Sequence, residues 1–131
     1  ALGLEIPEEY VREGVYHDPD RCAGLTQELL RLPEPPTCIL MPDDFSSIGG
    51  GNAIRRMGLH LPEDVSAAAY DGIQLASVMS PPLTTYRQDT AAIGATAAAK
   101  LIELIEKPRT ALVDRILIPG KLVEGGSVRA I

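Results

Sequence analysis

Polar side chains follow each of three strand-like runs in this sequence, and their types could bind a small molecule. Such side chains leave the carboxyl end of a strand, where parallel sheets bind their ligands. A carboxylate there can accept hydrogen bonds from the hydroxyl or N–H groups of a ligand. The rule singles out Asp43 and Asp44 after residues 37–41, Asp71 and Gly72 after residues 66–70, and Arg87 and Gln88 after residues 83–86.

The adjacent carboxylates Asp43 and Asp44 are expected to have separate roles. Neighbours that leave a strand point in different directions, so we do not expect them to share a proton as a catalytic dyad does. We expect Asp44 to cap the next helix and Asp43 to face a ligand. Asp71 has two open interpretations, a turn residue bonded to its own backbone and an acceptor for ligand hydroxyl or N–H groups.

Other catalytic and metal-binding patterns are missing from the sequence. Residues 49–52 (GGGN) lack the GK[ST] of a phosphate loop and lie within a helical pattern. The two histidines, His17 and His60, stand far apart without a Cys/His cluster, and no serine lies in a GxSxG elbow. We therefore expect no enzyme, no metal and no cofactor.

Charge and hydropathy exclude two kinds of partner. The 131 residues fit one ordinary domain, with 12 basic against 18 acidic residues and a net charge of −6. This sign opposes binding to a phosphate backbone, so we do not expect these residues to bind DNA themselves. No run of about 18 apolar residues is present, so we expect no membrane insertion.

The first 20 residues and the two cysteines indicate a cytoplasmic location. Residues 1–20 have neither a basic start nor an apolar signal core. Cys22 and Cys38 lack paired spacing and are expected to be buried free thiols.

Strands and helices are predicted to alternate along the chain. We expect strands at 9–17, 37–41, 66–70 and 83–86, extended segments at 115–118 and 121–123, and helices at about 18–32, 44–58, 73–78 and 89–107. Such alternation is typical of βαβ units. The expected fold class is therefore α/β, a parallel sheet with helices on both faces.

Several short motifs stand in a fixed order along the chain: residues 36–53, GLHLPEDVS at 58–66, Tyr70-Asp71, PLTT at 82–85 with Gln88, and Gly126-Ser127. Their order and spacing resemble those of the LacI/GalR family of bacterial transcription regulators. The resemblance covers nearly the whole chain and implies the later half of the effector-binding domain, a partial fold like that of type I periplasmic binding proteins.

This resemblance implies two lobes and parts that the chain lacks. Residues 1–80 and 113–131 would belong to the second lobe, while residues 81–112 would cross to the first lobe and give it a helix. The DNA-binding headpiece would lie outside this chain. The first strand of the second lobe would precede residue 1, leaving an exposed strand edge, so we expect a cleavage remnant or an oligomer that covers it.

The resemblance also assigns roles to individual residues. Asp71 matches the effector-contacting aspartate of the family, Asp43 a position often held by asparagine, and Gln88 a polar residue at the cleft. Ile48 and Met79 fall at positions that the family uses for its dimer face. Aspartate at position 43 removes a donor that asparagine would offer, which leaves the identity of the effector open.

The function expected from these features is a binding and dimerisation module of a transcription regulator. It would sense a sugar-like or nucleoside-like effector by lobe closure, form a homodimer and reach DNA only through the headpiece. The alternative is an exported sugar-binding protein of an uptake transporter. A hydrolase or nucleosidase on the same sheet would need an acid/base cluster that the sequence does not offer.

Overall fold

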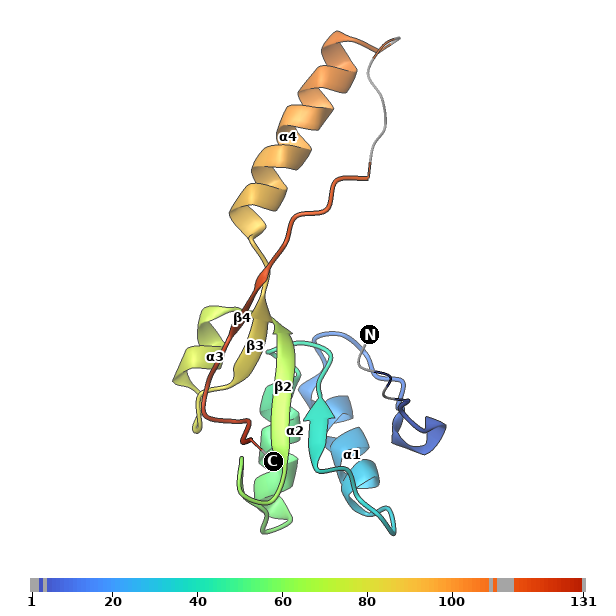
Figure 1. The fold of residues 1–131 in the computed structure, drawn as a ribbon, viewed down its shortest axis with the longest axis vertical. Helices are drawn as coiled ribbons and strands as arrows, with labels where there is room; N and C mark the ends of the chain where they lie inside the picture. The colour runs from blue at the N-terminus through green and yellow to red at the C-terminus, as the bar shows by residue number, and fades with distance from the viewer. Residues whose placement is uncertain (1–2, 4, 109, 111–114, 131) are drawn as a thin grey trace. The chain divides into compact units, whose positions relative to one another are not determined.

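The computed structural model describes residues 3, 5–108, 110 and 115–130, and the chain forms two compact units. The first unit comprises Ala1–Arg87 and Leu122–Ile131, and the second comprises Gln88–Lys121. Figure 1 labels the helices and strands in chain order.

Helix α1 (Pro19–Leu30) begins where the sequence predicts. Asp18 is its N-cap, and a side-chain oxygen of this residue accepts the backbone N–H of Arg21 at 2.9 Å. The cap satisfies one of the donors that a helix start leaves without a partner. Leu25 and Leu29 are buried on the apolar side of the helix, as the periodicity predicts.

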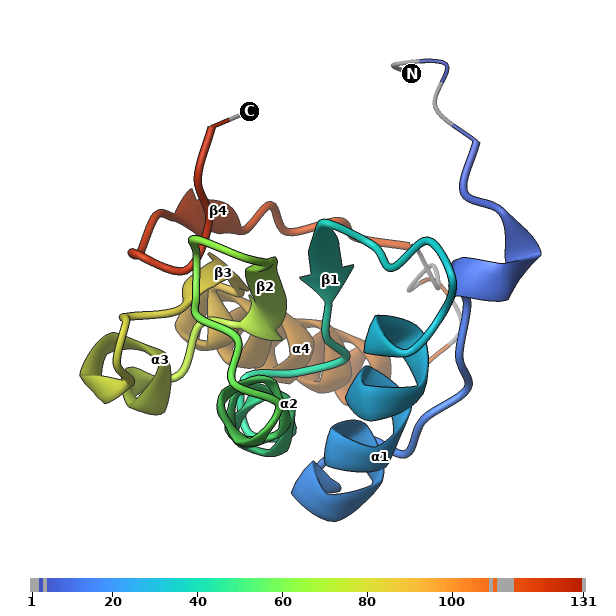
Figure 2. The same cartoon turned by 90° about the horizontal axis from the view of Figure 1, so that it is seen from below.

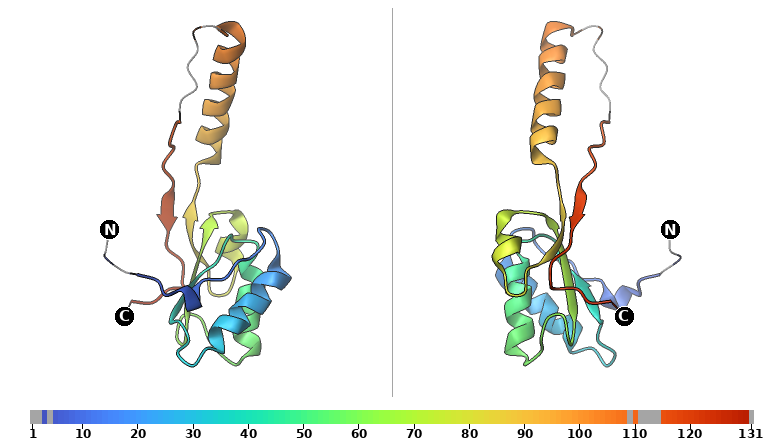
Figure 3. Two further views of the ribbon diagram at one scale, coloured as in Figure 1. Left: turned by 90° about the vertical axis from the view of Figure 1, so that its right-hand side faces the viewer. Right: turned by 60° about the vertical axis from the view of Figure 1, so that its left-hand side comes forward.

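Three parallel strands form the sheet of the first unit. They are β1 (Cys38–Leu40), β2 (Ser66–Asp71) and β3 (Thr84–Arg87), with Ile39 opposite Ala67 and Ala69 opposite Thr85. A short fourth strand, β4 (Lys121–Val123), completes the order β1-β2-β3-β4 and runs opposite to β3 (Figure 3). Strand β1 is therefore an edge strand of the described sheet.

Helix α2 (Ser47–Arg56) follows β1 and packs closely against α1. A Cβ atom on Gly49 would collide with the backbone of Pro19, and one on Gly50 would collide with the side chain of Met41. The glycines that lower the helix propensity of this segment therefore permit the close approach of the two helices.

Helices α1, α2 and α3 (Gln74–Val78) lie on one face of the sheet, as Figure 2 shows. The core between them is small and aliphatic. It comprises Cys22, Leu29, Ile39, Met41, Ile54, Val65, Ala67, Ala69, Ala76 and Leu83. The expected α/β class with a parallel sheet is confirmed.

The other face of the sheet carries apolar side chains that remain in contact with solvent. Leu40 is 77% exposed, and Tyr70 and Tyr86 stack on each other with ring centroids 5.6 Å apart. Among the described residues of the first unit no helix covers this face, so the unit supplies the expected helical layer on one side only (Figure 2).

The segment 9–17 differs from its prediction as a strand. It contains one 3-10 turn, η1 (Glu8–Tyr10), and no regular structure from Val11 to the turn before α1. The segment does not pair with a neighbouring strand, and its aromatic side chains make individual polar contacts instead. The hydroxyl of Tyr10, for example, donates to the carbonyl of Glu34 at 3.0 Å.

Both cysteines are free, and one of them is exposed. Cys22 is buried, as predicted, but Cys38 at the edge strand is exposed, so the prediction of burial is wrong there. Its strand belongs to the edge of the described sheet, and its side chain lies on the uncovered face with that of Leu40.

The second unit consists of a long helix, α4 (Thr90–Glu106), and the chain that follows it. Asp89 caps this helix by accepting the N–H of Ala92 at 2.9 Å, as the sequence predicts. Of the two predicted extended segments, 121–123 forms β4, while residues 115–118 lie in no strand. In the described part of the chain, no helix has both the length and the apolar composition needed to cross a bilayer.

Candidate functional site

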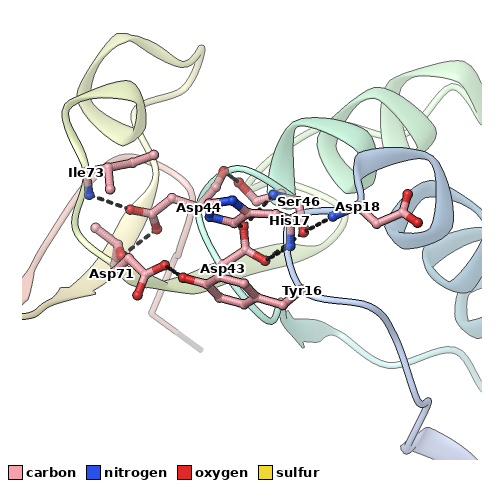
Figure 4. A network of polar contacts seen from close by, with 10 residues as sticks. Tyr16, His17, Asp18, Asp43, Asp44, Ser46, Asp71 and Ile73 are labelled. Carbon is pink, nitrogen blue, oxygen red and sulfur yellow. Dashed lines mark hydrogen bonds and ion pairs between the residues drawn. The ribbon is translucent and has the colours of Figure 1, made fainter.

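The candidate site lies where β1 and β2 end. Asp43 and Asp44 leave β1 after Pro42, and Asp71 is the last residue of β2. Because these strands are parallel and adjacent, their carboxyl ends meet at the same edge of the sheet. Figure 4 shows these carboxylates together with Tyr16, which comes from the segment before α1.

Asp43 is fully buried, and both of its oxygens already accept hydrogen bonds from the protein. Oδ1 accepts the N–H of Ser46 at 2.8 Å, while Oδ2 accepts the Ser46 hydroxyl at 2.6 Å and the N–H of His17 at 3.0 Å. The N–H of Asp18 donates in turn to the Ser46 hydroxyl at 3.0 Å. Asp43 therefore holds the segment before α1 to the start of α2.

The same contacts determine the charge state of Asp43. Burial alone would raise its pKa, but the hydrogen bonds from the Ser46 hydroxyl, the Ser46 N–H and the His17 N–H outweigh it, so the pKa of Asp43 lies below its ordinary value. The His17 imidazole lies 3.9 Å away and acts in the same direction. Asp43 is thus a buried carboxylate that stays ionised.

Asp44 is also fully buried, and it joins three strands. Its carboxylate accepts the N–H of Ile73 at 2.8 Å and the hydroxyl of Thr85 at 2.6 Å, and its own N–H donates to the carbonyl of Tyr70 at 3.0 Å. The prediction that Asp44 caps the next helix is wrong: Ser46 is the N-cap of α2, and the Ser46 N–H donates to Asp43.

Asp71 lies at the surface of this edge and is half-buried. Its φ of 108° is rare for a residue other than glycine and turns the chain sharply into Gly72. The Tyr16 hydroxyl donates a hydrogen bond to Asp71 Oδ2 (Figure 4). This hydrogen bond, followed by burial and the negative charges of Asp71, Asp43 and Asp44, raises the pKa of Tyr16 to about 12.

A row of rings adjoins the carboxylates. Tyr16 stacks on His17 with ring centroids 4.4 Å apart, and Phe45 lies tilted 5.4 Å from His17. Phe45 is 40% exposed, so part of this surface is open to solvent. Such rings can pack against the apolar face of a sugar or the plane of a base.

Gln88 belongs to the second unit, whereas Asp43 and Asp71 belong to the first. It directly follows Arg87, whose Nε donates to the carbonyl of Gly72 at 3.1 Å. The structure therefore brings Asp43 and Asp71 to one edge and places Gln88 at the start of the other unit.

Nothing in the spacing of Tyr16, His17 and Phe45 marks them as site residues. Tyr16 and His17 lie in the segment predicted as a strand, and Phe45 reads as an apolar residue at the start of a helix. His17 has a left-handed backbone with a φ of 59°, and its N–H donates to Asp43. Only the folded chain shows this contact.

The two residues predicted for a dimer face line one apolar groove of about 550 Å³. Ile48 comes from α2 and Met79 from the end of α3, and the Met79 sulfur accepts a hydrogen bond from the Ser47 hydroxyl at 3.7 Å. Arg55 and Glu63 also line this groove and give it charges of both signs.

The model of the periplasmic binding protein-like domain family matches residues 1–128. The chain belongs to this family. Its resemblance to the LacI/GalR regulators within the family is confirmed by the relatives and structures that it matches. The "Probable HTH-type transcriptional repressor ExuR" of Bacillus subtilis is 33% identical over 128 residues, which are 98% of this chain and 38% of ExuR.

Solved structures of family members agree with the fold. A complex of the transcriptional regulator CelR with cellobiose has a TM-score of 0.86 and 28% identity, covering 95% of this chain and 38% of that one. The Lac repressor dimer bound to operator and the anti-inducer ONPF has a TM-score of 0.78 and 28% identity, covering 86% of this chain and 39% of that one. The chain thus spans about two fifths of the length of these proteins.

Proposed function

We propose that this chain is the effector-binding and dimerisation part of a LacI-type transcription regulator that senses a small sugar-like or nucleoside-like ligand. The observation that carries the proposal is the meeting of Asp71 with the rings of Tyr16, His17 and Phe45 at the carboxyl edge of the sheet. A carboxylate beside rings suits a ligand with hydroxyl or N–H donors on one side and an apolar face on the other.

The relatives support a regulator over an exported binding protein. The printed names of ExuR, CelR and the Lac repressor describe transcriptional regulators, and the CelR structure holds a disaccharide, cellobiose. For the present chain, a related ligand would bind in the cytoplasm and change the equilibrium between two lobe arrangements. DNA would be bound by a headpiece outside this chain.

The two aspartates at the edge would differ in role. Asp71 is the proposed direct ligand contact because it is accessible and at the end of its strand. Asp43 would act on the ligand indirectly, since its oxygens hold Ser46 and His17. Gln88 would contribute from the other lobe, at the crossover between residues 81 and 112.

The site offers binding groups without a group poised for catalysis. The buried carboxylates have protein donors, and the hydroxyl of Ser46 donates to Asp43. Among the residues that the structure describes, no cluster of three histidine, cysteine or acidic side chains could hold a metal ion. We infer that the ligand leaves this site chemically unchanged.

The apolar groove of Ile48 and Met79 is the proposed dimer face. Besides apolar side chains it is lined by Arg55 and Glu63, which can meet opposite charges of a second copy in a twofold interface.

Replacing Asp71 in the full-length protein tests the proposal. Asparagine tolerates the left-handed backbone at this position, so Asp71→Asn removes the charge while keeping the turn. We expect ligand affinity to fall about 10- to 100-fold, the loss typical of a hydrogen bond to a charged group, and effector-dependent release of operator DNA to be lost. Calorimetry with cellobiose, lactose, ribose and nucleosides measures the affinity, and gel shift measures the release.

Asp20→Asn is the matched control, because Asp20 is an exposed carboxylate in the first turn of α1. It should bind ligand and DNA as the parent protein does. Unchanged affinity and unchanged operator release in Asp71→Asn would refute the assigned role of Asp71.

A further inference from the structure

The Tyr16 side chain connects the segment 11–17 to the end of β2 (Figure 4). Its hydroxyl donates to Asp71 Oδ2 across 55 positions of sequence. Immediately after Tyr16, the N–H of His17 is held by Asp43 and the N–H of Asp18 by Ser46. The segment is therefore fixed at its carboxyl end and reaches β2 through a single phenol.

The start of the segment is held to α1 by an ion pair, in which Arg12 Nε lies 3.4 Å from Glu28 Oε2. Val15 is 59% exposed, Tyr16 is 58% exposed, and residues 11–15 lie in no helix or strand. The Tyr16 ring stacks on His17, which is itself exposed, and belongs to no part of the core cluster. The Tyr16 side chain is therefore held at this edge by its hydroxyl and by the stacked ring of His17.

Left-handed backbone flanks this contact on both sides. His17 has a φ of 59° and Asp71 a φ of 108°, the two described residues other than glycine with a positive φ. Such conformations cost energy and occur often at binding sites and clamps.

We propose that Tyr16 is a built-in competitor for the ligand: in the ligand-free protein its hydroxyl occupies the Asp71 acceptor, and a ligand must replace it to bind. The inference rests on the proposed function of Asp71. In this proposal the ligand displaces the Tyr16 side chain, while the backbone bonds of His17 and Asp18 stay in place.

Competition of this kind sets a requirement for the ligand. A phenol is more acidic than the alcohol of a sugar, so it is the stronger hydrogen-bond donor. A single alcohol in its place would form a weaker hydrogen bond, whereas two neighbouring hydroxyls can donate to both oxygens of one carboxylate. Tyr16 therefore selects ligands that present paired donors, such as a vicinal diol.

The contact itself can be tested without a ligand. In full-length protein carrying ¹³C at the tyrosine ring carbon that bears the hydroxyl, Tyr16→Phe identifies the Tyr16 signal by its loss. We expect Asp71→Asn to move this signal, because its charged acceptor is gone. Tyr10→Phe is the control, since the Tyr10 hydroxyl donates to a backbone carbonyl, and it should leave the Tyr16 signal in place. A Tyr16 signal that does not move in Asp71→Asn would refute the proposed competition.

The competition is tested by affinity. Removing the hydroxyl while keeping the ring, Tyr16→Phe should tighten the binding of any panel sugar that binds the parent protein, cellobiose, lactose or ribose, by about three- to tenfold. In the double variant Tyr16→Phe with Asp71→Asn this gain should vanish. Weaker or equal binding by Tyr16→Phe would overturn the proposal.

The two tests fail in different ways. Loss of binding in Asp71→Asn together with unchanged affinity in Tyr16→Phe would keep the proposed function and reject the competitor. Unchanged binding in Asp71→Asn would reject the function itself. If no sugar of the panel binds the parent protein, the proposed role of Tyr16 is judged by whether its signal moves in Asp71→Asn.

Discussion

Asp43 is a buried residue that connects two segments of the proposed binding edge. A buried carboxylate is costly unless donors satisfy it, and Asp43 has three, from Ser46 and His17. These donors come from two segments that the chain separates by a helix and a strand. The residue therefore connects the segment before α1 to α2.

Removing this carboxylate should destabilise the first unit. Asp43→Ala leaves the donors of Ser46 and His17 without an acceptor, and we expect a loss of about 2–4 kcal/mol in the free energy of unfolding. Asp43→Asn keeps one oxygen and should cost less. Urea unfolding measures both, with the exposed Glu34→Ala as a control that should stay within about 0.5 kcal/mol of the parent.

Acid should remove the same contribution. Because the pKa of Asp43 is lowered on folding, its stabilisation is present above the ordinary value of 3.8 and is lost as the pH falls through the lower folded value. Asp43→Asn should therefore unfold with a weaker dependence on pH in this range. An identical acid dependence in the parent and the variant would contradict the assignment.

Tyr16 should act at the opposite end of the pH scale. Its pKa is raised from 10.0 to about 12 on folding, so the stability that it contributes is complete below pH 10 and is lost as the pH rises from 10 to 12. The difference in free energy of unfolding between the parent and Tyr16→Phe should shrink over this interval. Urea unfolding across pH 10 measures it, and a constant difference would show that the phenol carries no raised pKa.

At the scale of the elements, the contact of α1 with α2 depends on glycine. Gly49 faces the backbone of Pro19, whereas Gly24, in α1, has open space where a Cβ would lie. The two positions have similar helical backbones and opposite surroundings.

This pair gives a matched test. Gly49→Ala should destabilise the protein by about 3 kcal/mol, because the helices must move apart, while Gly24→Ala should stabilise it by about 0.5–1 kcal/mol through helix propensity. Thermal and urea unfolding measure both changes. Equal effects at the two positions would refute the role of close approach.

The elements themselves were largely predictable from the sequence. Proline, aspartate and apolar periodicity set the bounds of α1 and α4 within a few residues, and the apolar runs 37–41 and 66–70 predicted parallel strands. Segment 9–17 could not be predicted, because its aromatic residues have the composition of a strand and no strand beside them. The contacts of Asp43 and Asp44 could not be predicted either, since adjacent carboxylates differ only in which donors the folded chain brings to each.

At the scale of the whole molecule, the first unit presents two apolar surfaces of different kinds. One is the open sheet face of Leu40, Tyr70 and Tyr86, and the other is the groove of Ile48 and Met79. Parallel sheets are usually covered on both faces, so the first surface calls for a covering layer. The second is a candidate contact between copies of the full-length protein.

Charged residues introduced into the groove should weaken the contact between copies. Ile48→Asp or Met79→Asp would place a carboxylate in the proposed interface, so we expect the proposed dimer of the full-length protein to dissociate at concentrations where the parent stays dimeric. Analytical ultracentrifugation measures the change. Val78→Asp is the control, since Val78 precedes Met79 and is 71% exposed outside the groove. Unaltered dimerisation in both groove variants would place the interface elsewhere.

The Asp44 carboxylate connects the loop after β1 to residues that follow β2 and lie in β3. Because these partners come from three separate parts of the chain, the binding edge exists only once the sheet is assembled. A metabolite that binds this edge would therefore stabilise the folded protein. Once the site is saturated, the melting temperature should rise with the logarithm of the metabolite concentration. A search for the natural effector can accordingly be run as a thermal-shift screen, with no knowledge of the operator.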